Sequence, residues 1–295
     1  MKIITLLRLL AISLLAKIGA TIKKLPGNHI DTWIRLWSMR YFTDLGIARA
    51  FQLFVHPISS IRYFEFDFIL RNISTISNLR VLDVSSPREF AFYYCKKMQP
   101  DSYTMINPDS MDVGETKIQA DAFNVTNFSV VTGNALSLLY KNKSFDRVIS
   151  ISVIEHIEKD GDSKAIKEMW RVLKPGGKLI LTTHIAQHKR VEHRGHDQYN
   201  LSNIKRKKYF FQRVYDEESF KKRILSQVPV QSLAIQIWGE KEKGWFDAYI
   251  DRWIKRGLEE TVWDPWHMST RFKSYDSAEQ LPGIGVVGCA FKKPL

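Results

Sequence analysis

The sequence predicts an α/β fold with a doubly wound, mostly parallel sheet and an N-terminal helical extension. Short apolar segments alternate with helix-like segments over residues 79–185, and this alternation is typical of a parallel sheet covered by helices on both faces. Two further apolar segments, 230–239 and 284–292, can close the sheet as an antiparallel edge. We therefore expect seven strands.

Composition sets broad limits on what the protein can be. A chain of 295 residues with 44% hydrophobic residues can build one large domain with additions, and 15 Gly and 10 Pro exclude collagen-like chains. Cys95 and Cys289 form neither a disulfide framework nor a zinc-ligand spacing, so we expect a reducing, cytoplasmic compartment and no metal site. The net charge of +13 favours anionic ligands and phosphate-rich surfaces.

Residues 1–25 carry five cations and no acid; the first acid is Asp31. The longest uncharged run, Leu9–Ala16, is shorter than the roughly 20 apolar residues that span a bilayer. Arg8 interrupts the apolar region of a signal peptide. Three interpretations stay open: a basic amphipathic helix peripheral to an anionic membrane, a helix that packs its apolar face on the protein, and a cleaved signal peptide.

The remaining elements follow in chain order. Aromatic residues at helical spacing predict helices over residues 30–77, which complete the N-terminal extension 1–77. Strands are expected at 79–84, 102–107, 128–133, 145–153 and 178–184, and helices at 89–98, 162–173 and 216–227. Two segments interrupt the pattern as insertions: 187–223 has eleven Lys or Arg against five acids, and 240–280 is rich in Trp.

Polar side chains occupy the ends of the predicted parallel strands. Asp83 ends the first, Asn107 and Asp109 follow the second, Asn134 follows the third, and Ser152 lies at the end of the fourth. The carboxyl ends of parallel strands share one edge of the sheet, where ligands bind at the switch in strand order. The sequence therefore predicts a ligand site formed by these side chains.

Four segments in the order VLDV, GNA, SFDRVISISVIEHI and WRVLKPGGKLILTTH resemble the class I S-adenosylmethionine-dependent methyltransferases. The nearest resemblance is to the branch with a Glu-His pair after the fourth strand and an LKPGG turn before the fifth. It covers residues 79–185, and the last two strands fit the family's closing hairpin. It implies a Rossmann-like methyltransferase domain over 78–295, with S-adenosylmethionine as cofactor.

The resemblance also implies roles for individual residues. Asp83 takes the position of the first-loop acid near methionine, and Asn107, with Asp109 as a substitute, takes the ribose position. Asn134 takes the adenine-reading position, and His156 lies between cofactor and acceptor. The implied cofactor-binding residues are Asp83, Ser85, Asn107, Asp109, Asn134, Ala135, Ser150 and Ser152.

The first loop departs from the family pattern, in which glycines let the cofactor lie close to the backbone. Ser85, Pro87 and Glu89 stand there instead. Ser fits that place if its φ is negative, whereas Pro fixes φ and lacks an N–H donor. Two interpretations follow: an altered loop that still binds cofactor, or a non-catalytic domain that serves as a partner or scaffold.

An activated sulfonium methyl needs proximity and alignment for transfer, and an oxygen acceptor also needs a base. His156 is the first candidate base and His184 the second. We expect O-methylation of a small-molecule, glycan or lipid-linked acceptor, held between the segments 187–223 and 240–280. Cations of Lys205–Lys208 would meet its anionic groups and Trp rings would stack on it.

A nucleic-acid methyltransferase is the third alternative. The net charge of +13 and the Lys205–Lys208 run favour it. Against it, the fourth strand lacks the Asn/Asp-Pro-Pro-Tyr tetrapeptide of enzymes that methylate amino groups of nucleic acids. We therefore do not expect a nucleic-acid partner.

Overall fold

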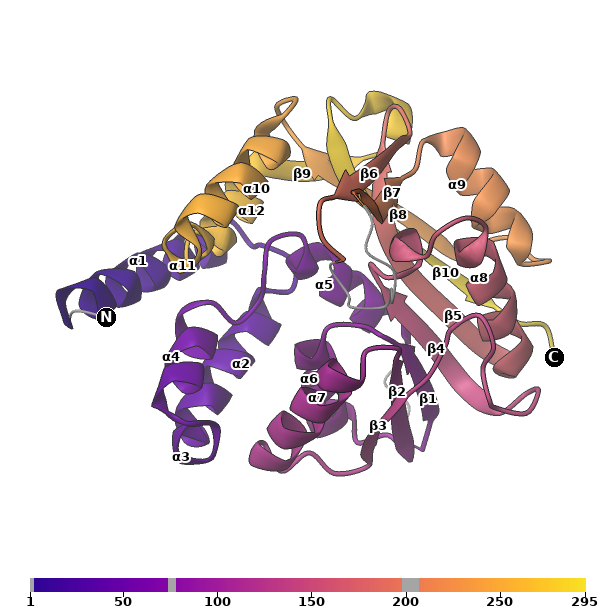
Figure 1. Cartoon of the computed structure of the whole chain (residues 1–295), viewed down its shortest axis with the longest axis horizontal. Coiled ribbons are helices and arrows are strands. Elements are labelled where there is room, and N and C mark those ends of the chain that lie inside the picture. Colours follow the sequence, from indigo (N-terminus) through magenta and orange to yellow (C-terminus); the bar gives the residue numbers. More distant parts are fainter. Residues whose placement is uncertain (1–2, 74–77, 198–206) are drawn as a thin grey trace.

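The computed structural model describes residues 3–73, 78–197 and 207–295. Its centre is a sheet in the order β3-β2-β1-β4-β5-β10-β8-β9 (Figure 1). The strands from β3 to β5 in this order are parallel, and β10 pairs antiparallel with both β5 and β8. The predicted Rossmann-like α/β fold with an antiparallel edge is confirmed. The strands are β1 (Arg80–Val84), β2 (Ser102–Asn107), β3 (Phe128–Thr132), β4 (Phe145–Ile151), β5 (Leu173–Ala186), β8 (Ala234–Glu240), β9 (Phe272–Tyr275) and β10 (Ile284–Lys292).

The sheet has eight strands, so the expectation of seven is wrong by one. The additional strand is β9, which pairs antiparallel with β8 at the edge, for example Tyr275 opposite Ile237. β9 has four residues and lies within the Trp-rich segment 240–280. So short a segment shows little alternation of its own, and its extended conformation depends on pairing with β8.

Helices cover both faces of the sheet (Figure 1). Helices α5 (Arg62–Ile73) and α6 (Arg88–Met98) share one apolar cluster, and α8 (Gly161–Val172) and α9 (Glu217–Arg223) share the other. Helix α7 (Ser110–Ala122) packs against β2 and β3. A Cβ atom on Gly288 of β10 would lie 2.4 Å from Phe68 of α5. Glycine at this position therefore lets α5 approach the sheet closely.

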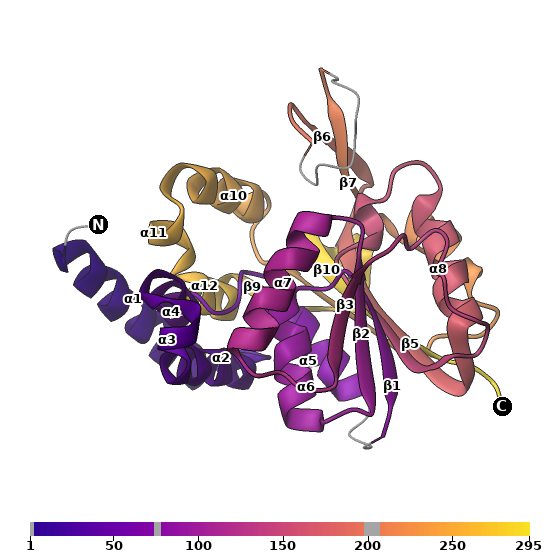
Figure 2. The ribbon, with the colours of Figure 1, turned by 60° about the horizontal axis from the view of Figure 1, so that its bottom comes forward.

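Two segments far apart in sequence form a helical group on one side of the molecule (Figures 1 and 2). The N-terminal helices are α1 (Ile3–Ile22), α2 (Asn28–Arg40), α3 (Phe42–Leu45) and α4 (Ile47–Val55). The segment 240–280 adds α10 (Trp245–Arg256), α11 (Leu258–Thr261) and α12 (Asp264–Arg271), and α1 packs on α12 and α4. The buried carboxylate of Asp31 in α2 pairs with Lys17 of α1 and with Arg35 of α2, and so connects α1 to α2.

The segment 187–223 contains a hairpin outside the main sheet. Strands β6 (Arg190–Arg194) and β7 (Tyr209–Val214) pair antiparallel and project beyond the sheet (Figure 2). Of the predicted basic run Lys205–Lys208, the first two residues lie outside the described residues, as does Lys2. The described end of this segment brings β7 to the carboxyl end of β4, next to the short helix Ile154–His156.

Candidate active site

A cavity of 760 Å³ opens at the carboxyl ends of β1, β2 and β4. β1 lies between β2 and β4, where the strand order reverses, and this is the position at which open α/β sheets bind ligands. Five of the residues singled out from the sequence line the cavity together: Ser85, Asn107, Asp109, Ser152 and His156. The strand-end pattern therefore located the cavity correctly.

The loop after β1 adopts the conformation that a glycine would provide. Ser85 has φ +55°, in the left-handed region, rather than the negative φ expected for serine. Its N–H and its hydroxyl both donate to the Ile106 carbonyl at 2.9 Å, which offsets a conformational cost of about 1 kcal/mol. Pro87 precedes α6, where its missing N–H breaks no helical hydrogen bond. Ser85 and Pro87, which stand where the family pattern has glycines, are therefore compatible with this turn.

Asp83 lies fully buried beneath this loop and does not line the cavity. Its carboxylate accepts hydrogen bonds from the Ser86 N–H at 2.9 Å and from the Tyr103 hydroxyl. Burial raises the pKa of Asp83 to about 6, and these two hydrogen bonds oppose the rise. Asp83 therefore orients the loop from below.

The loop after β2 carries a network of carboxylates. Asp109 caps α7, since its side chain accepts from the Met111 N–H at 2.8 Å. Asn107 donates to Asp112 at 2.6 Å, and Arg88 of α6 pairs with Asp112 from the other side. Burial raises the pKa of Asp112 although Arg88 opposes the rise. Sequence reasoning missed Asp112 and Arg88, because their pairing joins two helices.

The other predicted site residues do not line the cavity. Ser150 is buried in the sheet and donates to the Val84 carbonyl at 3.3 Å. Asn134 lines a separate cavity of 90 Å³, and the adjacent Ala135 packs against the apolar cluster of α8. His184 contacts the buried Glu155 at 3.0 Å. Burial would raise the pKa of Glu155, but His184 and the charge of His156 hold it below its ordinary value.

His156 is held by the hairpin. Its Nδ1 donates to the Phe211 carbonyl of β7 at 2.7 Å, so the second ring nitrogen, Nε2, carries the lone pair in the neutral ring. Burial lowers the pKa of His156, and the nearby Glu155 opposes this shift. The imidazole is therefore neutral at pH 7, the form that accepts a proton.

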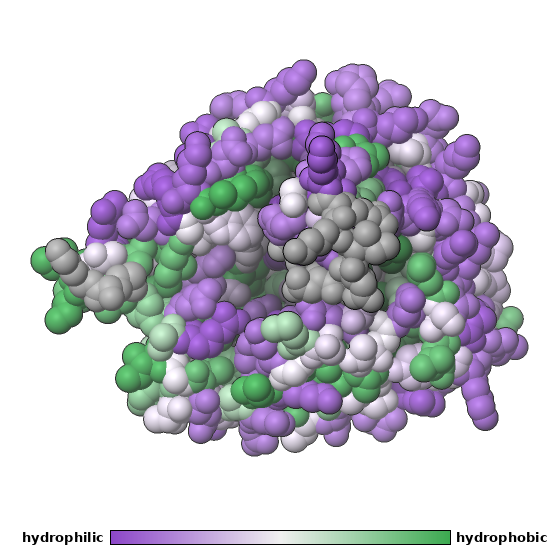
Figure 3. Space-filling view, viewed as in Figure 1, coloured by the Kyte–Doolittle hydropathy of each residue, from purple (hydrophilic) through white to green (hydrophobic). Residues whose placement is uncertain are grey.

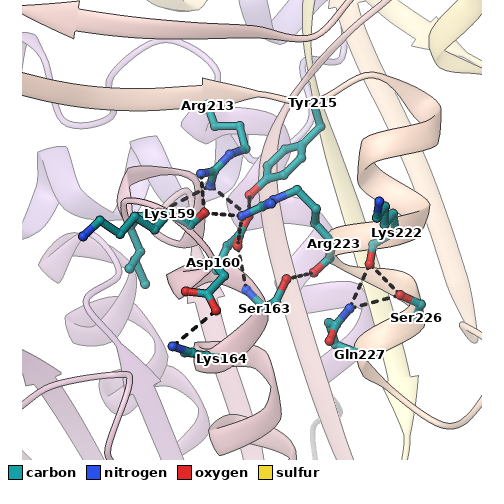
Figure 4. A network of polar contacts seen from close by, with 12 residues as sticks. Lys159, Asp160, Ser163, Lys164, Arg213, Tyr215, Lys222, Arg223, Ser226 and Gln227 are labelled. Atoms are coloured by element: carbon teal, nitrogen blue, oxygen red, sulfur yellow. Dashed lines mark hydrogen bonds and ion pairs between the residues drawn. The ribbon is translucent and has the colours of Figure 1, made fainter.

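A polar network fixes the position of β7 (Figure 4). Three side chains donate hydrogen bonds to the buried carboxylate of Asp162, at the start of α8. They are Arg213 of β7, Tyr215 just after β7, and Arg223 of α9. The distances to Asp162 are 2.8, 2.7 and 2.6 Å respectively. The hairpin that holds His156 is thus tied to α8 and α9.

Helix α5 contributes a buried acid that contacts Ser152, a residue of the cavity lining. Glu65 is fully buried; it accepts hydrogen bonds from Ser152 and Thr182 and pairs with Arg62 at 2.5 Å. Arg62 and Arg49 of α4 line the cavity wall. The aromatic spacing over residues 30–77 predicted this helix but not the contacts of Glu65. The signal it missed is an acid flanked by Phe64 and Phe66.

The segments expected to form the acceptor pocket meet, since Arg190 pairs with Asp247 at 2.8 Å and a cavity of 530 Å³ is lined by both Glu217 and Tyr275. Neither segment lines the cavity of 760 Å³. Trp245, Trp263 and Trp266 line an open cavity of 460 Å³ that contains no described residue of 187–223. The reason is that α12 packs on α1 rather than over the cavity of 760 Å³. The segment 187–223 contributes Phe211 next to His156, while Arg49 and Arg62 come from the N-terminal extension.

The residues of the cavity fit S-adenosylmethionine. The left-handed backbone conformation of Ser85 would let the cofactor lie close to the backbone of the loop. Asn107 and Asp109 supply acceptors for hydroxyl groups, and Arg62 supplies a cation for a carboxylate. A volume of 760 Å³ is also within the usual range for cofactor sites.

Part of the chain is similar to a known protein family. Residues 82–181 match the family model described as a methyltransferase domain. Over these residues the chain is similar to that family. The match covers 100 of 295 residues and includes β1 to β4 and most of β5. The domain thus carries Asp83, Ser152 and His156, whereas Arg49 and Arg62 lie outside it.

Curated relatives match parts of the methyltransferase domain. The ubiquinone/menaquinone biosynthesis C-methyltransferase UbiE of Shewanella oneidensis is 35% identical over 96 residues, covering 32% of this chain and 37% of that protein. The demethylmenaquinone methyltransferase of Bacteroides fragilis is 30% identical over 105 residues, 35% of this chain and 42% of the relative. A mouse (Mus musculus) protein named a tRNA methyltransferase 9B is 45% identical over 53 residues, 18% of this chain and 12% of its own length. The chain therefore spans less than half the length of these relatives.

Solved structures share the fold. A SAM-dependent methyltransferase from Methanosarcina mazei aligns with a TM-score of 0.50 and 15% identity, covering 77% of this chain and 97% of that one. YcgJ from Bacillus subtilis aligns with a TM-score of 0.52 and 15% identity, covering 79% and 99%. The [4+2]-cyclase SpnF aligns at 0.50 with 17% identity, covering 78% and 80%. Since a cyclase is among these structures, the fold alone does not define the reaction.

Proposed function

We propose that this protein transfers a methyl group from S-adenosylmethionine to an oxygen atom of a small-molecule, glycan or lipid-linked acceptor. The proposal rests on one observation: the strand-end residues that would bind the cofactor and a neutral histidine line the same cavity. Ser85, Asn107 and Asp109 line one part of this cavity and His156 lines another. The family match over residues 82–181 and the methyltransferases among the relatives, one of them named a C-methyltransferase, support methyl transfer as the class of reaction.

The cofactor supplies an activated methyl group when it is bound, and the protein supplies position and a base. The loop Ser85–Ser86, Asn107, Asp109 and Ser152 would hold the cofactor. His156 would take the acceptor's hydroxyl proton on Nε2, while the Phe211 carbonyl keeps the proton on Nδ1. Arg49 and Arg62 line the same cavity, so an acceptor with a negative group fits it well.

Calorimetry with S-adenosylmethionine and S-adenosylhomocysteine tests the cofactor. We expect both to bind wild type, and a Ser85→Val variant to bind at least tenfold more weakly, because a β-branched residue disfavours φ +55°. A folded wild-type protein that gives a flat titration with either compound would contradict the proposal. That result would favour the alternative of a non-catalytic partner or scaffold.

A histidine pair tests the base. With radiolabelled S-adenosylmethionine and hydroxyl-bearing acceptors, His156→Gln should lower kcat about 10²–10⁴-fold and leave cofactor affinity within about twofold. His188→Gln, an exposed histidine of the segment 187–223 that does not line the cavity, is the control and should behave as wild type. Because burial lowers the pKa of His156, wild-type activity should persist below pH 6.5. Equal kcat values for His156→Gln and wild type would show that transfer relies on proximity alone.

A further inference from the structure

Helix α1 packs on the protein through its small and polar side chains. Its buried residues are Leu9, Ser13, Ala16 and Ala20. The Ser13 hydroxyl donates to the Val55 carbonyl at 2.6 Å, and Lys17 pairs with the buried Asp31 at 2.8 Å. A Cβ atom on Gly19 would lie 2.5 Å from the Trp266 ring of α12. These contacts hold α1 against α4, α2 and α12.

The large apolar side chains of α1 point away from the protein. Successive residues of a helix are about 100° apart, so these side chains form one stripe about 120° wide. The space-filling view shows apolar side chains at the α1 end of the molecule (Figure 3). Exposed patches of this kind mark an interaction surface. The members are Ile3, Ile4, Leu7, Leu14, Leu15, Ile18 and Ile22, which are between 42% and 79% exposed.

Cations border the stripe. Arg8 lies at its edge, and Lys23 and Lys24 follow its C-terminal end; all three are exposed, and residues 1–25 contain no acid. An apolar helix face flanked by cations is the pattern of helices that lie in the interface of an anionic bilayer. Charge complementarity therefore selects an anionic lipid surface as the occupant.

The neighbouring helix α12 extends this surface. Trp266, which packs on Gly19, is 39% exposed and also lines the open cavity of 460 Å³. Arg252 and Arg256 line the same cavity and pair there with Glu260. Arg271, also in its lining, pairs with Glu242. Tryptophan and arginine are favoured at the level of lipid head groups, where a ring meets hydrocarbon and a cation meets phosphate.

We propose that the outward face of α1 binds an anionic phospholipid bilayer, with the helix lying in the plane of the interface. Among the described residues, α1 is the one helix long and apolar enough to cross a membrane. An α1 that spans the bilayer would lose the contact of Ser13 with Val55 and that of Lys17 with Asp31. These buried contacts therefore favour a helix in the plane of the interface. This inference is independent of methyl transfer.

Co-sedimentation with vesicles tests the surface on the full-length protein. Vesicles of 70% phosphatidylcholine and 30% phosphatidylglycerol should bind wild type, and vesicles of pure phosphatidylcholine should bind it more weakly. Leu14→Gln with Ile18→Gln should reduce binding roughly tenfold or more. Lys23→Gln with Lys24→Gln should reduce it roughly fivefold per cation on the anionic vesicles. The matched control is Ile118→Gln with Leu139→Gln, which are 71% and 93% exposed on other elements.

Several outcomes would overturn the proposal. Wild type that stays in the supernatant, or a Leu14/Ile18 variant that binds as wild type does, would exclude lipid docking by this face. If wild type is a dimer that does not bind vesicles and the Leu14/Ile18 variant is a monomer, a second copy of the chain covers this face of α1. Resistance to alkaline carbonate extraction would indicate spanning. Calorimetry with S-adenosylmethionine on the same variants keeps the result separate from the proposed activity, because the stripe does not line the cavity of 760 Å³.

Discussion

Asp83 and Glu65 are both fully buried carboxylates, yet their surroundings differ in charge. Glu65 pairs with the guanidinium of Arg62, whereas the hydrogen bonds of Asp83 come from an amide and a phenol. Burial without a paired cation disfavours the ionised form, which is why the pKa of Asp83 rises to about 6. An acid at a strand end can therefore serve the fold of a loop rather than contact a ligand.

The raised pKa of Asp83 predicts a component of stability that falls as pH rises. Below about pH 4 the carboxyl is protonated in folded and unfolded chains alike, and between pH 4 and 6 it ionises first in the unfolded chain. The folded state should lose up to about 3 kcal/mol over this window. Asp83→Asn should remove that component. Urea unfolding of both proteins at pH 4, 5, 6 and 7 measures it, and parallel pH dependences would contradict the assignment.

At the scale of elements, α5 links the N-terminal extension to the site. Its Glu65 holds the ends of β4 and β5 through Ser152 and Thr182, and its Arg62 lines the cavity. Helix α4 contributes Arg49 to the same wall. The N-terminal helices therefore form part of the site and lie outside the matched methyltransferase domain.

Removing the acid of α5 should destabilise the protein strongly. Glu65→Ala leaves Arg62 and two hydroxyl groups without their acceptor and should lower the free energy of unfolding by about 3 kcal/mol. Asp67→Ala on the same helix removes a pair with the half-exposed Arg71 and should cost about 0.5 kcal/mol. Urea denaturation measures both. Similar losses for the two variants would show that the Glu65 network is energetically unimportant.

The packing of α1 gives a second prediction at this scale. Gly19→Ala places a methyl group 2.5 Å from the Trp266 ring and should lower stability by about 1–3 kcal/mol. Gly114→Ala in α7 is the matched control, since no heavy atom lies within 4 Å of its Cβ position, and it should raise stability by about 0.5–1 kcal/mol. Thermal unfolding compares them. An unchanged Tm for Gly19→Ala would mean that α1 does not rest on α12.

At the scale of the whole molecule, one cavity joins the extension to the sheet. Arg49 and Arg62 come from the N-terminal helices, while Ser85 and His156 come from the methyltransferase domain. A ligand that fills this cavity contacts both parts. The residues on either side of the boundary expected near residue 77 thus line one cavity.

This arrangement predicts one cooperative unfolding transition that the cofactor shifts as a unit. S-adenosylmethionine at about 100 times its Kd should add about 2.7 kcal/mol, which raises Tm by about 5–10 °C. Differential scanning calorimetry with and without cofactor measures the shift. Two separate transitions, of which one responds to cofactor, would show that the extension unfolds independently.

The sequence by itself predicted seven of the eight strands of the sheet and the strand ends that line the cavity. Strands such as 79–84 and 145–153 carry their signal in local apolar patterns, and strand order at a parallel edge brings Ser85, Asn107, Asp109 and Ser152 together. What such patterns record is the conformation of a segment and the face it buries.

Only the tertiary structure decided which side chains meet. Glu65, Arg88 and Asp112 acquire their partners from other elements, and β9 is a strand because β8 lies beside it. His184 turned toward Glu155 and His156 toward the cavity, although both end apolar segments. Likewise α1 buries Ser13 and exposes leucines because Val55 and Trp266 lie where they do. Contacts of this kind join residues that are far apart in the sequence. The spacing of residues along the chain therefore does not predict them.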